Sequence, residues 1–235
     1  MSEFFKFGGV DSRQFYAEVF ELRTFDAPAR SYDTKVIPGR NGTMLLDGNR
    51  YGNIEHSYSC IIHQNFSQNY TNFRNSLLSK VGYQRLEDSM HTNEYYMAYY
   101  KEDVSPTIDE RRSMGKMVIR FERKPQRYLK SGEASISFTE TGTINNQTLF
   151  DSKPLLRIYG VGTVGIGDNA ITVIDCDDYV DVDCEMMEAY KGVISYNDNI
   201  SIQNIDFPVL KPGINNIRLG SGITQIDITP RWYML

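Results

Sequence analysis

The sequence predicts a mainly β protein that is built from two domains. Most segments alternate apolar and polar residues with a period of two, which is typical of half-buried strands. Only one segment repeats with the period of a helix, and the second half of the chain holds short strand patterns separated by turn signals. A length of 235 residues allows one large or two small domains, and the change of pattern along the chain favours two.

Strands account for most of the first half. In residues 54–62 the positions Ile54, Tyr58, Cys60 and Ile62 fall on one face, and polar residues fall on the other. Residues 117–122 and 134–138 alternate in the same way. The tyrosine-rich run 94–100 predicts a strand that is covered on both faces.

One helix is predicted, over residues 67–82. Ser67 is a suitable N-cap, and Gly82 is a suitable stop. The apolar side chains of this segment form one stripe, consisting of Tyr70, Phe73, Leu77 and Val81. We expect the stripe to pack on a sheet from the same half of the chain.

Residues 124–132 are predicted to connect the two domains. This segment contains charged residues, a proline and a glycine between two strand patterns. We therefore predict an N-terminal domain over residues 1–131 and a C-terminal domain over residues 132–235. The second domain has no helix candidate of any length, and its short strands and frequent turns predict an antiparallel β-sandwich.

Residues 36–52 are unusually rich in glycine and turn-forming residues. Asn41-Gly42 and Asp47-Gly48 are hairpin turn dipeptides, and the strand-like residues 43–46 lie between them. Two interpretations are open for this stretch: a projecting arm, or an ordinary irregular surface loop.

The composition excludes several classes of function. A net charge of −5 gives no electrostatic case for nucleic-acid recognition or for an anionic membrane surface. The N-terminus does not resemble a secretion signal, and no apolar run is long enough to span a bilayer, so we expect a soluble protein that is made in the cytoplasm. Three cysteines are too few for a disulfide framework, and we expect reduced thiols.

A glycine motif raises the possibility of a dinucleotide site. Gly160, Gly162 and Gly165 have the G-x-G-x-x-G spacing after an apolar run. A pyrophosphate site needs a helix to begin there, but residues 170–174 are β-branched and favour a second strand. The glycines therefore predict a hairpin, and we expect no cofactor.

Neither metal binding nor catalysis is expected. His56 falls in the apolar series of its strand, His63 and His91 lie near the ends of elements, and none forms a spaced zinc motif with the cysteines. The acidic run 175–185 lacks the glycine of a calcium loop, and its alternation predicts a strand with a solvated acidic face. No nucleophile elbow or P-loop is present, and sequence cannot show the facing carboxylates of a glycosidase. We expect a protein that is not an enzyme.

Four segments carry a resemblance to a known family. They are FERKPQRYLKSG (121–132), LFDSKPLLRIYG (149–160), FPVLKPGIN (207–215) and ITPRWY (228–233). The chain resembles the distal tail (Dit) proteins of siphophages and related prophages, in which these motifs occur in the same order. The resemblance spans nearly the whole chain.

The resemblance implies both a fold and a role. It implies an N-terminal β-sandwich-like domain with a helix and a protruding hairpin, followed by a galectin-like C-terminal sandwich. Six copies would form a ring at the tail tip of the virion, made and assembled in the cytoplasm of the host bacterium. This hub would join the tail tube protein above to a tail-associated lysin, tail fibre or receptor-binding baseplate protein below, without inserting into a membrane.

A closed ring requires that one surface of a subunit meets a different surface of its neighbour. We predict that residues 38–52 form one half of this contact by reaching onto the adjacent subunit. The interface residues expected from this stretch are Gly39, Arg40, Asn41, Gly42, Asp47, Gly48 and Tyr51.

A carbohydrate-binding sandwich that recognises host cell-wall polysaccharide is the alternative. Some relatives carry inserted sugar-binding modules, but this chain is too short to hold one. The side-chain cluster of a galectin sugar site is not evident either. Trp232, the only tryptophan, is expected to anchor a terminal strand.

Overall fold

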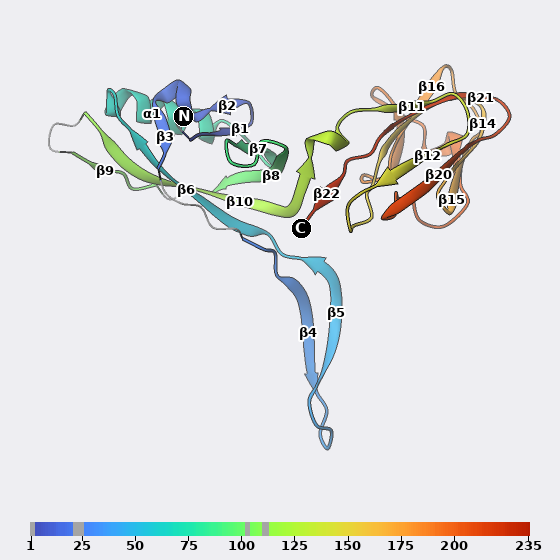
Figure 1. Ribbon diagram of the computed structural model, residues 1–235, viewed down its shortest axis with the longest axis horizontal. Helices are drawn as coiled ribbons and strands as arrows, with labels where there is room; N and C mark the ends of the chain where they lie inside the picture. Colours follow the sequence, from blue (N-terminus) through green and yellow to red (C-terminus); the bar gives the residue numbers. More distant parts are fainter. Residues whose placement is uncertain (1–2, 21–25, 102–103, 110–112) are drawn as a thin grey trace. The chain divides into compact units, whose positions relative to one another are not determined.

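The structure is a computed structural model, and it describes residues 3–20, 26–101, 104–109 and 113–235. The chain divides into two compact units (Figure 1). Unit 1 runs to Arg127 and includes Leu235, whereas unit 2 is Tyr128–Met234. The predicted boundary at residue 131 lies a few residues beyond this division. The mainly β character predicted from the alternation is confirmed.

Unit 1 contains an antiparallel sheet and a separate hairpin. Its elements are β1 (Phe5–Phe7), β2 (Val10–Asp11), the 3-10 helix η1 (Ser12–Phe15), β3 (Ala17–Val19), β4 (Arg30–Val36), β5 (Thr43–Tyr51), β6 (Ile54–Ile62), α1 (Phe66–Leu78), β7 (Gln84–Asp88), β8 (Glu94–Lys101), β9 (Thr107–Ile108) and β10 (Gly115–Leu129). The sheet has the order β2-β1-β7-β8-β10-β6-β3, and β9 pairs with β10. The predicted strand 54–62 is β6, which lies between β10 and β3, and its neighbour β10 includes the predicted strand 117–122.

Strand β10 also contains most of the predicted interdomain connection. Residues 124–129 continue the strand as far as Leu129, so the connection is extended chain and not a loop. Pro125 is tolerated on the β6 side of the strand because the register of β10 with β6 ends at Arg123, and a proline cannot donate a ladder hydrogen bond.

Helix α1 packs against the sheet through an aromatic core. Phe66, Phe73 and Leu77 are buried in the same cluster as Phe5 and Tyr58 of the sheet. The rings of Phe5 and Tyr58 are stacked, with centroids 4.7 Å apart. The prediction of a helix that packs on a sheet of the same half of the chain is thus confirmed.

The predicted ends of the helix are wrong. The N-cap is Asn65, in the left-handed conformation, and Ser67 lies inside the first turn. The helix ends at Leu78 and is capped by Ser79, so the stripe does not continue to Val81, whose side chain is 87% exposed. Gly82 has a positive φ, but it lies beyond the helix and does not stop it.

Unit 2 is a sandwich of two antiparallel sheets. Its elements are η2 (Lys130–Gly132), β11 (Ile136–Phe138), β12 (Gly142–Asn146), β13 (Leu155–Gly160), β14 (Gly162–Ile166), β15 (Asn169–Val173), β16 (Tyr179–Asp183), β17 (Glu188–Lys191), β18 (Ile194–Ser195), η3 (Asn197–Asn199), β19 (Ile200–Ile202), β20 (Gly213–Leu219), β21 (Ile223–Thr229) and β22 (Tyr233–Met234). One sheet has the order β11-β21-β13-β16-β17-β18, and the other has the order β12-β20-β14-β15-β19. Both sheets contribute to one buried apolar core, as the sequence predicts for this half.

Trp232 is buried in that core, and its carbonyl accepts a hydrogen bond of 2.8 Å from the Leu129 amide. It therefore anchors the C-terminal strand, as predicted. The specific likeness of unit 2 to galectins stays a prediction.

The glycine motif forms strands, as its flanking residues predict. Gly160 ends β13, and Gly162 and Gly165 belong to β14, which pairs with β15 in a hairpin. A Cβ on Gly160 would lie 2.2 Å from the carbonyl oxygen of Gly222, at a φ of 96°. The motif thus allows two backbone segments to approach closely, and no helix begins behind it.

Replacing Gly160 with alanine is expected to destabilise unit 2 by about 2–4 kcal/mol, through backbone strain together with overpacking. Gly192→Ala is the matched control, because Gly192 also has a positive φ but has open space where a Cβ would lie. We expect the control to cost about 1 kcal/mol. Chemical denaturation of both variants measures the difference, and equal losses would contradict the close approach.

The acidic run forms strand β16, but its predicted solvated face is wrong. Asp181 and Asp183 are only 6% and 3% exposed. Arg157 donates hydrogen bonds of 2.7 and 2.9 Å to Asp181, and Arg231 donates two of 2.8 Å to Asp183. The alternation failed as a guide because bidentate arginine pairs neutralise the carboxylates and let both faces of the strand be covered.

The pairing of Asp183 makes the stability of unit 2 sensitive to acid. Burial pushes the pKa of Asp183 up, but hydrogen bonds from Arg231 and from the amides of Met186 and Glu185 outweigh it and hold the pKa below its ordinary value. A lowered pKa contributes stability that is present above the unfolded value of about 4 and is lost as the pH falls through the folded value.

We therefore expect the free energy of unfolding of unit 2 to fall as the pH drops below about 4. The slope should be reduced in Asp183→Asn and unchanged in Asp198→Asn, because Asp198 is exposed. Urea denaturation at several pH values measures the slope. The same slope in Asp183→Asn and the wild type would contradict this role of Asp183.

Candidate functional site

The hairpin β4–β5 is the most unusual surface of unit 1. It forms a two-stranded sheet of its own, and Figure 1 shows it leaving the larger sheet where β6 begins. In the described part of the chain, each of its strands pairs only with the other, so both outer edges carry free backbone donors and acceptors. A lone two-stranded hairpin is marginally stable in water, which favours a partner that covers it.

Apolar side chains are exposed on both faces of the hairpin. Register pairs Thr34 with Leu45 and Val36 with Thr43, so Val36 and Leu45 share one face. Their side chains are 72% and 58% exposed. The other exposed apolar residues of the hairpin are Tyr32, Met44 and Leu46. Exposed apolar side chains along two open edges are typical of a surface that another chain covers.

An ion pair closes the base of the hairpin. Arg30 Nε donates a hydrogen bond of 3.0 Å to Asp47, a second guanidinium nitrogen pairs with the other carboxylate oxygen, and Arg30 Nη1 lies 3.4 Å from the Tyr51 hydroxyl. This pairing raises the pKa of Arg30 and lowers that of Asp47. Gly52 also donates to the Ala29 carbonyl, at 3.0 Å, so the two ends of the hairpin lie side by side.

The predicted interface residues occupy two places in the hairpin. Gly39, Arg40, Asn41 and Gly42 form the loop at the tip, where the two glycines have positive φ. Asp47, Gly48 and Tyr51 belong to β5 near the base. The structure therefore brings the first four together, and it brings Asp47 and Tyr51 together through Arg30. Their role in an interface stays a prediction.

The expected turn at Asp47-Gly48 is wrong, because these residues lie inside β5. They form a bulge opposite Ser31, where the register shifts, and Asn49 there has a φ of 50°. A Cβ on Gly48 would lie 3.1 Å from the Ser31 carbonyl oxygen. The Asp47-Gly48 dipeptide thus forms a bulge within the strand and not a turn between strands.

Arg30 and the exposed apolar residues are absent from the interface that the sequence predicts. Arg30 gives no signal of its own, because its partner is known only once the register of the two strands is known. The apolar residues 44–46 did give a signal of an exposed apolar surface. They are three consecutive apolar residues between turn-rich segments, and they do not alternate with polar residues.

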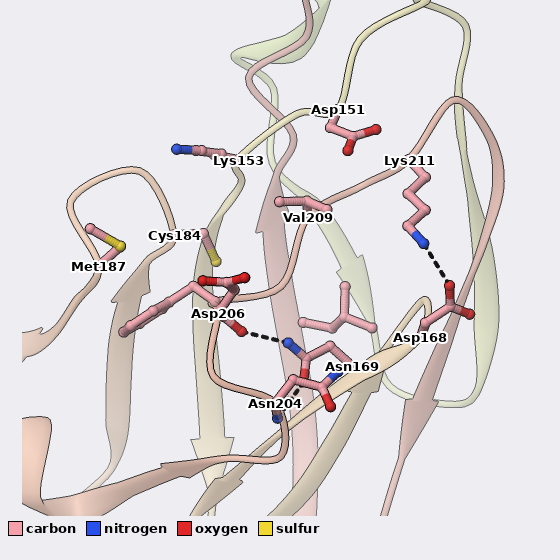
Figure 2. Close-up of a pocket in the computed structure, with 12 residues that line it drawn as sticks. Asp151, Lys153, Asp168, Asn169, Cys184, Met187, Asn204, Asp206, Val209 and Lys211 are labelled. Atoms are coloured by element: carbon pink, nitrogen blue, oxygen red, sulfur yellow. Dashed lines mark hydrogen bonds and ion pairs between the residues drawn. The ribbon is translucent and has the colours of Figure 1, made fainter. Parts of the chain in front are cut away.

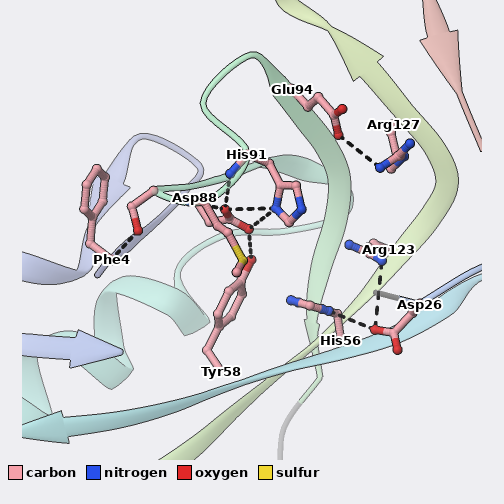
Figure 3. Close-up of polar contacts among 11 residues, drawn as sticks. Phe4, Asp26, His56, Tyr58, Asp88, His91, Glu94, Arg123 and Arg127 are labelled. Carbon is pink, nitrogen blue, oxygen red and sulfur yellow. Dashed lines mark hydrogen bonds and ion pairs between the residues drawn. The ribbon is translucent and has the colours of Figure 1, made fainter. Parts of the chain in front are cut away.

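A buried polar cluster lies beside the segment that leads into the hairpin (Figure 3). His56 Nδ1 lies 3.1 Å from Asp26, and Arg123 lies 4.0 Å from the same carboxylate. Burial lowers the pKa of His56, and the charge of Arg123 lowers it further. His56 falls in the apolar series of its strand and is indeed buried, with Asp26 as its hydrogen-bond partner, so the cluster connects Asp26 to strands β6 and β10.

The other two histidines lie near element ends, as expected. His91 contacts Asp88, which also accepts a hydrogen bond of 3.1 Å from the Tyr58 hydroxyl (Figure 3). His63 follows β6 directly. Across the described residues, no three His, Cys, Asp or Glu side chains are grouped so that they could hold a metal ion. Within the same residues, no helix has the length and apolar character needed to cross a bilayer.

The fold has counterparts among solved structures. The Dit protein (gp 19.1) of phage SPP1, described as a paradigm of the hub adsorption apparatus in phages that infect Gram-positive bacteria, matches with a TM-score of 0.73. The match covers 100% of both chains, at 13% sequence identity. This chain has the Dit fold.

Two structures of the phage P2 baseplate in its activated conformation extend the comparison. The one with Ca matches with a TM-score of 0.52 at 12% identity, and the one with Sr matches with 0.50 at 10% identity. Each match covers 97% of this chain and 98% of the other. No family model and no curated protein sequence matches. At these identities the likeness concerns the fold alone, and it agrees with the fold that the four sequence motifs imply.

Proposed function

We propose that this protein is a structural hub of a phage tail tip. Six copies form a ring that joins the tail tube to a tail-associated lysin, tail fibre or receptor-binding baseplate protein. The observation that carries this proposal is the likeness to the SPP1 Dit hub over the whole length of both chains. The protein would thus reside at the tail tip of a virion and be assembled in the bacterial cytoplasm.

The hairpin supplies the contact that a ring needs. Its edges offer unpaired backbone groups, and its faces offer apolar side chains, so it suits strand addition or side-chain docking on a neighbouring copy. A contact between a protruding arm and a different surface of the next subunit is head-to-tail, and such contacts form a ring when the rotation from one subunit to the next closes. This role is mechanical, and the proposal assigns the protein no catalytic step.

Excising the hairpin tests the proposal. Residues 31–50 can be replaced by a short Gly-Ser linker, because Ala29 and Gly52 are hydrogen-bonded at the base. Native mass spectrometry of the intact protein should give six times the chain mass of 27.0 kDa. The excised variant should stay folded by circular dichroism and have the mass of one chain. A hexamer that survives the excision would rule out the hairpin as the contact, and a wild-type monomer would contradict the ring.

A further inference from the structure

Unit 2 contains a pocket of about 450 Å³ at one end of the sandwich (Figure 2). It lies among residues 151–153, the turn between β14 and β15, the segment after β16, and the loop 204–211. Its volume is in the range of small-molecule sites. The hairpin and the tail-hub proposal make no use of it.

A short backbone pairing aims charged side chains into this pocket. Ser152 and Leu210 exchange two backbone hydrogen bonds, of 3.0 and 2.8 Å. The side chains of both residues are fully buried on the core side of this pairing. Because side chains alternate along an extended chain, their neighbours Asp151, Lys153 and Lys211 point to the opposite side. All three line the pocket.

The loop on the other side of the pocket is held in place by Asn169. Its side-chain amide donates to the Asp206 carbonyl at 2.7 Å, and its side-chain oxygen accepts from the Asn204 amide at 3.3 Å (Figure 2). The Gln203 amide donates to the Ala170 carbonyl at 2.9 Å. The pocket is therefore formed before any ligand binds, which lowers the entropic cost of binding.

The interior of the pocket is apolar. Ile166 and Cys184 in its lining are fully buried, and the half-buried Phe207 and Val209 supply apolar surface that a ligand can contact. Burial raises the pKa of Cys184 to about 12, so its thiol is neutral and packs like an apolar side chain.

The rim offers unused polar groups. Lys211 is occupied by Asp168, at 2.8 Å. Asp151, Lys153 and Asp206 make no side-chain hydrogen bond or ion pair in the described part of the chain, and they leave two carboxylates and one ammonium for a ligand. The net charge of these three groups disfavours phosphates and other anions. Carboxylates accept hydrogen bonds from hydroxyl or amine groups, and an ammonium donates to hydroxyl oxygens.

We propose that this pocket binds one pyranose unit of an uncharged or amino sugar. A sugar ring presents an apolar C–H face to Phe207 and Val209, while its hydroxyl groups or amine reach the carboxylates and the ammonium at the rim. This site goes beyond the proposed hub role. Sugar binding can be tested independently of ring formation.

Ligand-observed saturation-transfer NMR on the full-length protein tests the site. The probes are glucose, galactose, N-acetylglucosamine and glucosamine, each at ~10 mM, because single sugars bind weakly. Glucose 6-phosphate is the anionic comparison. We expect transfer to at least one of the four sugars and weaker transfer to the phosphate. Asp206→Ala and Asp151→Ala should each weaken binding at least about tenfold, since each removes a charged hydrogen-bond acceptor.

Asp178→Ala is the matched control, because Asp178 is also an exposed acid of unit 2 but lies outside the pocket. It should bind as the wild type does. Native mass and thermal unfolding of all three variants should match the wild type, which separates this site from the ring. The proposal is overturned if none of the four sugars shows saturation transfer. It is also overturned if the Asp206→Ala and Asp151→Ala variants bind as tightly as the wild type, or if glucose 6-phosphate binds more tightly than the sugars.

Discussion

The double substitution Val36→Asp with Leu45→Asp is expected to reduce the mass of the main species in solution about sixfold, from a ring to a single subunit. Both side chains lie on one face of the hairpin and are largely exposed. If this face docks on a neighbouring copy, the two new carboxylates lose their water without gaining a partner. This cost opposes assembly. Sedimentation velocity measures the change.

The same substitutions should barely affect the fold of the subunit, because exposed positions usually change stability by less than about 0.5 kcal/mol. Val81→Asp is the matched control, since Val81 is an exposed valine of the same unit outside the hairpin. It should leave the ring intact. A double variant that assembles like the wild type would show that this face of the hairpin is not an interface.

Replacing Arg231 with methionine should destabilise unit 2 by about 3 kcal/mol, because it leaves the buried carboxylate of Asp183 without its cationic partner. Arg231 holds that carboxylate through two hydrogen bonds of 2.8 Å. The loss can be measured as the change in the free energy of unfolding in urea at neutral pH.

The double variant Arg231→Met with Asp183→Asn should recover much of this loss, since a neutral amide costs less to bury than an unpaired charge. Arg157→Met provides a comparison, because the Arg157 side chain is more exposed than that of Arg231. A loss below about 1 kcal/mol for Arg231→Met, or no recovery in the double variant, would contradict the pairing.

The sequence predicts strand and helix type well wherever a single buried face sets the pattern. The alternation at Tyr58 and Cys60 and the stripe of Phe73 and Leu77 both correspond to buried faces of unit 1. The ends of the helix are less predictable, because Asn65 caps it through its backbone conformation and without a side-chain hydrogen bond. A local pattern cannot show such a cap.

Features that depend on residues far apart in the chain are not predictable from local pattern. Asp183 is covered because Arg231, from the C-terminal segment, reaches its strand. The glycine-rich stretch predicts a hairpin, but its bulge at Gly48 depends on the register with Ser31. The pocket of unit 2 likewise depends on residues far apart in the chain, because Ser152 pairs with Leu210 beside it, and no motif in the sequence marks it.

Electron microscopy of the purified full-length protein tests the central claim most directly. The proposed function predicts closed annular particles with sixfold symmetry in class averages, without any added partner. Class averages that contain only isolated subunits, at concentrations where sedimentation also gives the mass of one chain, would contradict it.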